Sequence, residues 1–136
     1  MSPDNIKKNV LEEIERTEEL KKAYTLLSEN GLYKDAVTKL YYYLLYHIRA
    51  LLLTKELEPK SHEGALRLFS LYFVKDGKFE PMSAHTFSKL MKYREEADYT
   101  SSYLFTKEDF EQLKKETEDL SGLIRKHLRE GRFVIE

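Results

Sequence analysis

Basic and aromatic residues recur along one face of a predicted helix in the stretch 35–52. Spaced three or four positions apart, they are Asp35, Lys39, Tyr42, Tyr46 and Arg49. Cationic groups interleaved with aromatic rings can bind phosphates while the rings stack on bases. Tyr and Arg are also favoured at protein–protein interfaces, so a homodimer contact explains the pattern equally well. The stretch therefore predicts a binding face and leaves two occupants open, a nucleic acid or a second copy of the chain.

Arg94 comes in the sequence after three apolar residues that share one face of another predicted helix. That face consists of Phe87, Leu90 and Met91. Helical spacing places Arg94 on the same buried side, where a guanidinium keeps its charge and needs acceptors. Asp98 is the nearest candidate, and Tyr99 and Tyr103 offer hydroxyls. Two interpretations stay open, an internal ion pair that anchors the end of the helix and a cleft in which the guanidinium meets a phosphate.

His62 follows Ser61, which is a good N-cap residue for a third helix. An imidazole in the first helical turn lies near the positive end of the helix, which favours its neutral form. A neutral imidazole could act as a general base or accept a proton from a ligand. The alternative is a structural hydrogen bond to a neighbouring loop. His47 is expected in the packed core, and His85 and His127 at the surface or rim.

Several stronger chemistries find no support in the sequence. There is no Glu-x-x-His pair, no His-Glu-x-x-His helix, no glycine-rich phosphate loop and no serine nucleophile motif. The chain has no cysteine, which excludes disulfides and thiolate metal sites. We therefore expect no metal and no cofactor, and a metal-dependent or covalent enzyme is disfavoured.

Composition favours one soluble domain. The 136 residues leave room for one hydrophobic core, so residues 1–136 are expected to form a single domain. Lys and Arg total 23 against 24 for Asp and Glu, so no overall field attracts nucleic acid or membrane. The charged N-terminus lacks a secretory hydrophobic segment, and apolar runs fall short of the roughly 18–20 residues of a membrane helix. A cytoplasmic protein with no membrane contact is the simplest expectation.

Apolar residues at helical spacing predict an all-α, up-and-down bundle of four to five helices. The expected helices run from Pro3 to Leu27, from about Tyr33 to Lys55, from Ser61 to before Asp76, from Pro81 to Ala97 or Tyr99, and from about Lys107 to Glu130. The second has so wide an apolar arc that it should be the central element.

Three ordered fragments resemble a known family. The stretch 35–52, the tripeptide Lys60-Ser61-His62 and the closing Arg94…Ala97-Asp98-Tyr99 are similar in order and spacing to small stand-alone HEPN proteins. The similarity is best over residues 30–100. It implies a helical bundle that dimerises head to head. It also implies a minimal nucleotidyltransferase as a partner, in a toxin–antitoxin pair.

The resemblance also identifies a departure. Active HEPN ribonucleases carry an Arg followed, after four to six residues, by a His, and two such motifs meet across the dimer. Arg94 matches that Arg, but the positions for the His hold Tyr99, Thr100 and Ser101. Without that imidazole, a general base for attack by a ribose 2′-hydroxyl is missing, unless His62 replaces it in space. Two functions follow: an interaction module for a nucleotide, RNA or nucleotidyltransferase, and a metal-independent endoribonuclease. A dimer whose polar cluster is purely structural is the third.

Overall fold

Helix α2 (Tyr33–Leu53) lies at the centre of the bundle in the computed structural model, which describes residues 2–99 and 105–134. It contacts α1 (Pro3–Glu29), α3 (His62–Phe69), α4 (Pro81–Tyr99) and α5 (Lys107–Glu130). Thirteen of its 21 residues are buried, which is the wide arc that the sequence predicts for a central helix. The all-α class is confirmed, and the described residues contain no strand.

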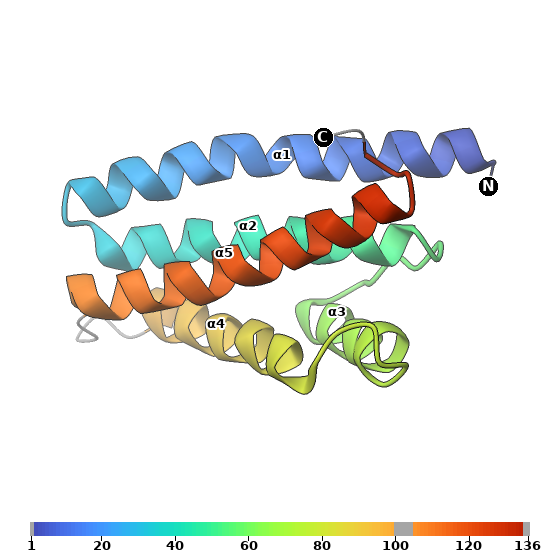
Figure 1. Cartoon of the computed structure of the whole chain (residues 1–136). Coiled ribbons are helices and arrows are strands. Elements are labelled where there is room, and N and C mark those ends of the chain that lie inside the picture. Colours follow the sequence, from blue (N-terminus) through green and yellow to red (C-terminus); the bar gives the residue numbers. More distant parts are fainter. Residues whose placement is uncertain (1, 100–104, 135–136) are drawn as a thin grey trace.

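Helices α1, α2, α4 and α5 run alternately up and down, as Figure 1 shows. Helices α1 and α2 form an antiparallel pair, α5 crosses α2, and α4 lies beneath them. The short α3 is inserted between α2 and α4 and packs beside the start of α4. The architecture is the up-and-down bundle that the helical periodicity indicates.

The first two helices are separated by a glycine turn. Gly31 has a φ of +75°, the left-handed conformation that favours glycine. The N–H of Leu32 donates to the carbonyl of Leu27 over 2.8 Å, and the N–H of Gly31 donates to Ser28 over 3.0 Å. This pair of bonds is a Schellman motif, which satisfies two carbonyls at the end of α1. The pair Asn30-Gly31 predicts a helix end here from the sequence, and the structure confirms it.

The third helix differs from its prediction. After Phe69 the backbone widens into a π-helical turn, η1 (Ser70–Val74), and the N–H of Lys75 donates to the carbonyl of Ser70 over 2.8 Å. The wider turn carries Phe73 into the core and leaves Tyr72 40% exposed. Helical spacing from Ala65 and Phe69 predicts Tyr72 on the same apolar face, and this prediction is wrong because it assumes an unbroken 3.6-residue period.

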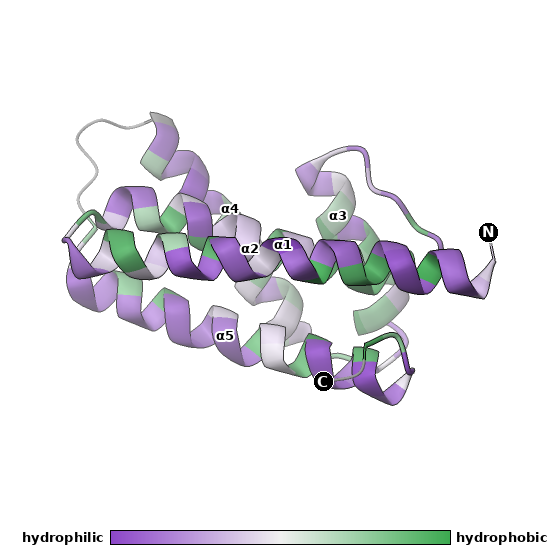
Figure 2. Cartoon of the chain, turned by 90° about the horizontal axis from the view of Figure 1, so that it is seen from above, coloured by the Kyte–Doolittle hydropathy of each residue, from purple (hydrophilic) through white to green (hydrophobic). Residues whose placement is uncertain are grey.

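Helix α5 begins at a reciprocal capping box. The hydroxyl of Thr106 accepts from the N–H of Asp109, and the carboxylate of Asp109 accepts from the N–H of Thr106. The sequence itself, Thr106 followed three residues later by Asp109, predicts this box with Asp in place of the usual Glu, and the structure confirms it. Buried apolar residues from all five α-helices form one core, and the ribbons of α1 and α5 are coloured largely hydrophilic in Figure 2. Among the described residues, no helix is both long and apolar enough to cross a membrane.

Candidate functional site

Arg94 is held against the bundle near the end of α4. Its side chain is only 14% exposed, and its terminal nitrogen donates to Oδ2 of Asp98 over 3.1 Å. The other carboxylate oxygen of Asp98 accepts from the hydroxyl of Thr38, in α2, over 3.3 Å. The internal ion pair that the spacing suggests is therefore present, and it fastens α4 to the start of α2.

Two tyrosine rings of α2 lie under this guanidinium. The central carbon of Arg94 is 5.0 Å from the ring centre of Tyr41 and 6.0 Å from that of Tyr42. Cation–π attraction of this kind holds a partly desolvated cation in place. Tyr41 is fully buried, and burial raises the pKa of its phenol above the usual range. The pair fixes the direction of Arg94 without neutralising it.

Two polar atoms in this cluster lack partners. The Nε of Arg94 and the hydroxyl of Tyr41 are both buried, and neither makes a hydrogen bond. Buried polar groups are rarely left unpaired, because each missing bond costs about 1–3 kcal/mol. Both groups are donors, so an added acceptor could satisfy them.

His62 belongs to the same cluster. Its ring lies 5.3 Å from the ring of Tyr41 and 6.1 Å from that of Tyr42. It is the first residue of α3, where Ser61 caps the helix by accepting from the N–H of Gly64 over 2.9 Å. The fold thus brings His62 and Arg94, which are 32 positions apart, to the same two aromatic rings. We call the group Thr38, Tyr41, Tyr42, His62, Arg94 and Asp98 the Arg94 cluster.

The predicted face of α2 continues away from this cluster. Tyr46 lies 6.5 Å from Tyr42, and the guanidiniums of Arg16 and Arg49 lie 5.4 and 5.7 Å from its ring centre. Lys39 is exposed and lines a cleft with Tyr46 between α1 and α2. Of the remaining predicted site residues, Tyr103 and the side chain of Tyr99 lie outside the described part of the chain.

A buried polar network on the other side of α2 escaped the sequence analysis. Arg125 of α5 donates from Nε to Nε2 of His47 and from a terminal nitrogen to the hydroxyl of Thr17, both over 3.0 Å. His47 and Thr17 are fully buried. The expected core position of His47 is confirmed, but its hydrogen bond to an arginine was not foreseen. The network joins α1, α2 and α5, so its role is to fix the bundle.

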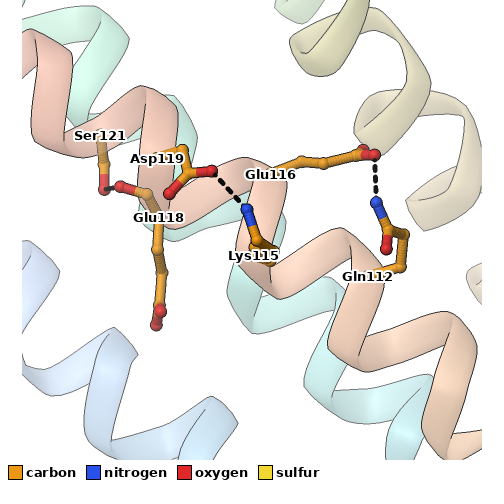
Figure 3. A network of polar contacts seen from close by, with 6 residues as sticks. All are labelled: Gln112, Lys115, Glu116, Glu118, Asp119 and Ser121. Carbon is orange, nitrogen blue, oxygen red and sulfur yellow. Dashed lines mark hydrogen bonds and ion pairs between the residues drawn. The ribbon is translucent and has the colours of Figure 1, made fainter.

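Carboxylates of α5 reach both neighbouring helices. In Figure 3 the side chain of Glu118 extends toward α1 and that of Glu116 toward α4. Glu118 accepts from the hydroxyl of Tyr24 over 2.6 Å, and Glu116 pairs with Lys89. Partial burial opposes ionisation of Glu116, but the hydrogen bonds from Lys89 and Gln112 outweigh it and lower its pKa. These contacts hold α5 in place. The residues of the Arg94 cluster come from α2, α3 and α4.

Residues 11–127 match the family model described as the HEPN domain. The chain belongs to the HEPN family. The resemblance read from three sequence fragments is thereby confirmed, and the Arg94 cluster contains Arg94 and His62, two residues of those fragments. Within the described part of this HEPN domain, no three His, Asp or Glu side chains are grouped so that they could hold a metal ion.

Relatives of this HEPN domain include two proteins of Methanocaldococcus jannaschii. "Putative toxin MJ0605" is 39% identical over 126 residues, which are 93% of each chain. "Putative toxin MJ0142" is 35% identical over 100 residues, 74% of this chain and 68% of the relative. A "UPF0332 protein" of Thermotoga maritima is 32% identical over 101 residues, 74% of this chain and 76% of the relative.

Proposed function

We propose that this HEPN domain is the toxin-like member of a two-protein system and binds an RNA or nucleotide phosphate at the Arg94 cluster. The carrying observation is the pair of buried atoms without partners, Nε of Arg94 and the hydroxyl of Tyr41. An Arg fork suits a phosphate, because its several donors match the phosphate oxygens. Tyr42 and Tyr46 would offer rings on which bases stack. The names of the two archaeal relatives support the toxin assignment.

In this proposal the active form is a homodimer, and Lys39, Tyr42 and Tyr46 lie beside the shared groove. The second protein is a minimal nucleotidyltransferase, as the family resemblance implies. Asp98 pairs with Arg94 at the end of α4 and would give way to the ligand. Tyr103 is a further expected contact. No cofactor is required, because the ligand is held by side chains alone.

Binding of a fluorescent RNA oligonucleotide and of ATP to the purified protein tests this function. Arg94→Ala should weaken binding by about tenfold or more, since a charge-assisted contact contributes about 1.5–3 kcal/mol. The matched control is Arg129→Ala, which removes an exposed cation at the far end of α5. Equal affinity of wild type and Arg94→Ala, with both folded, would reject the proposal.

A metal-independent endoribonuclease is the second candidate. It is favoured by the contact of His62 and Arg94 with the same tyrosine rings. Arg94 would stabilise charge on the phosphate, and His62 or Tyr99 would move the proton of the 2′-hydroxyl. RNA cleavage in excess EDTA, lost in Arg94→Ala and in His62→Ala but kept in His85→Ala, would establish this activity. If the wild type does not cleave RNA, the endoribonuclease is excluded and the binding module remains the proposed function.

A purely structural cluster predicts a different result. Replacing a partly buried ion pair by an apolar side chain is often neutral or stabilising, so Arg94→Met should then keep dimer and stability. A large loss of RNA or partner binding in a folded, dimeric Arg94→Met protein would exclude that alternative.

A further inference from the structure

A cleft of about 500 Å³ lies between α1, the end of α2 and the segment that leads to α3. It is separate from the Arg94 cluster and shares no residue with it. Three carboxylates line it, Glu12, Glu13 and Glu58, against two cations, Arg49 and Lys60. An apolar wall completes it, formed by Leu53, Leu57 and Pro59. Carboxylates beside an apolar wall suit a ligand with a cationic head on a hydrocarbon stem.

Glu13 is the distinctive residue of this cleft. It is only 8% exposed, and its Oε2 is buried without a hydrogen-bond partner. Its other oxygen lies 3.5 Å from a nitrogen of Arg49 and 3.9 Å from one of Arg16, both beyond ordinary hydrogen-bond length. The two guanidiniums lie over the ring of Tyr46 instead. A buried carboxylate with such weak pairing would gain a strong hydrogen bond from an added donor.

The acidic surface continues beyond this cleft. A second cleft of about 800 Å³ between α1 and α2 shares Glu12 and is also lined by Glu15, Glu18 and Glu19. Arg16, Lys22 and Lys39 are its cations, so carboxylates again outnumber them. A single small amine would use one end of this surface, whereas an extended basic polypeptide would meet acidic groups in both clefts. The glutamates of α1 repel phosphates and make that wall unsuited to a nucleic acid, whereas Lys39 and Tyr46 on the α2 wall belong to the face proposed for RNA.

We infer that the Glu13 cleft is a docking site for a basic segment of a partner protein, with one arginine or lysine side chain inserted against Glu13. The methylene stem of that side chain packs on Leu53 and Leu57, and its N–H groups donate to the Glu13 carboxylate. Flanking basic residues of the same segment lie along the glutamates of α1. The assignment goes beyond RNA binding at Arg94, and the two proposed surfaces meet only at Lys39 and Tyr46 of the second cleft.

The test uses a capped Lys-Leu-Arg-Leu-Lys peptide titrated into the full chain and followed by amide chemical shifts. The peptide should shift the amides of Glu13, Leu53 and Leu57. Citrulline in place of its arginine, or Glu13→Gln in the protein, should weaken binding by about tenfold, because a charge-assisted hydrogen bond is lost. Glu111→Gln, an exposed change on α5, should have no effect.

A second variant keeps the test decisive if Glu13→Gln does not fold. Glu12→Gln with Glu58→Gln alters two exposed residues and should weaken the peptide about threefold through lost charge attraction. Equal binding of the arginine and citrulline peptides would overturn the docking site. Spermidine binding as tightly as the peptide would also overturn it, in favour of a free-polyamine site. Conversion of a dimer to a monomer by the peptide would instead identify a second copy as the occupant.

Discussion

Nε of Arg125, in α5, donates a 3.0 Å hydrogen bond to Nε2 of His47, which is fully buried in α2. The opposite ring nitrogen, Nδ1, lies 2.8 Å from the carbonyl oxygen of Tyr43. A carbonyl only accepts, so the proton is on Nδ1 and the imidazole is neutral. The pKa of His47 is lowered to about 4, chiefly by burial; the hydrogen bond to the Tyr43 carbonyl opposes this shift, and the positive charges of Arg125 and Lys21 add to it.

This neutral imidazole makes stability depend on pH. Because the folded-state pKa of His47 is depressed, its contribution is fully present above pH 6.5, the unfolded value, and is lost as the pH falls toward 4. The free energy of unfolding should decrease by up to about 3 kcal/mol through this group. Urea unfolding at pH 7.5, 5.5 and 4.5 measures the decrease.

The contribution of His47 is the difference between wild type and His47→Gln in the pH slope of the unfolding free energy. The glutamine cannot be protonated in this range. His85→Gln is the matched control, because His85 is exposed in α4 and the variant keeps His47. Parallel pH slopes for wild type and His47→Gln would contradict a neutral buried imidazole.

Tyr41 and Tyr24 are both fully buried but differ in the partner of the hydroxyl. That of Tyr24 donates to Glu118 over 2.6 Å, whereas that of Tyr41 has no partner. Tyr24→Phe should therefore cost about 1–3 kcal/mol of unfolding free energy, and Tyr41→Phe about zero or a slight gain. Thermal and urea unfolding of the two variants decide this. A cost above about 1 kcal/mol for Tyr41→Phe would mean that its hydroxyl is satisfied in solution.

The sequence was sufficient for the helices and their caps, because these depend on local spacing. The apolar stripe of α2, the glycine turn after α1 and the capping box of α5 all follow from residues within one or two turns of each other. The π-helical turn at Ser70–Val74 was missed, because no residue type marks a change from 3.6 to wider spacing. Because of that turn, the buried residue is Phe73 and Tyr72 is exposed.

The site could be predicted only in part. Arg94 and Asp98 are four residues apart on one helix, so their pairing is visible in the sequence. The contact of His62 with Tyr41 joins two helices through a loop whose path the sequence does not determine. The bond from Arg125 to His47 spans 78 positions, and a polar residue between apolar ones on α5 gives no signal of its partner. Glu13 was missed for the same reason.

Gly31 and Gly122 form a matched pair for the backbone. Gly31 has a φ of +75° at the end of α1, so Gly31→Ala should lower the unfolding free energy by about 1 kcal/mol through strain in the left-handed region. Gly122 lies inside α5, and an added methyl group there would meet nothing within 4 Å. Gly122→Ala should raise stability by about 0.5–1 kcal/mol. Opposite shifts of the melting temperature check both, and a common sign would contradict the assigned turn.

A carboxylate oxygen of Asp98 accepts from a terminal nitrogen of Arg94 over 3.1 Å, and its other oxygen accepts from the hydroxyl of Thr38. A bound anion must therefore compete with this carboxylate for the guanidinium. Asp98→Asn keeps the shape of the side chain and removes the competing charge. In the proposed binding module it should tighten RNA or ATP by about fivefold, because the loss of a partly exposed ion pair amounts to about 1 kcal/mol.

Fluorescence titration of Asp98→Asn against wild type, at two salt concentrations, measures this gain, which should shrink at high salt as the charges are screened. Asp119→Asn is the matched control, since Asp119 forms the same four-residue pair with Lys115 on the exposed face of α5. Tighter binding in Asp98→Asn alone assigns Asp98 the part of an internal competitor. Weaker binding would contradict this and would mean that Asp98 supports the ligand, either by contacting it or by holding Arg94 in place.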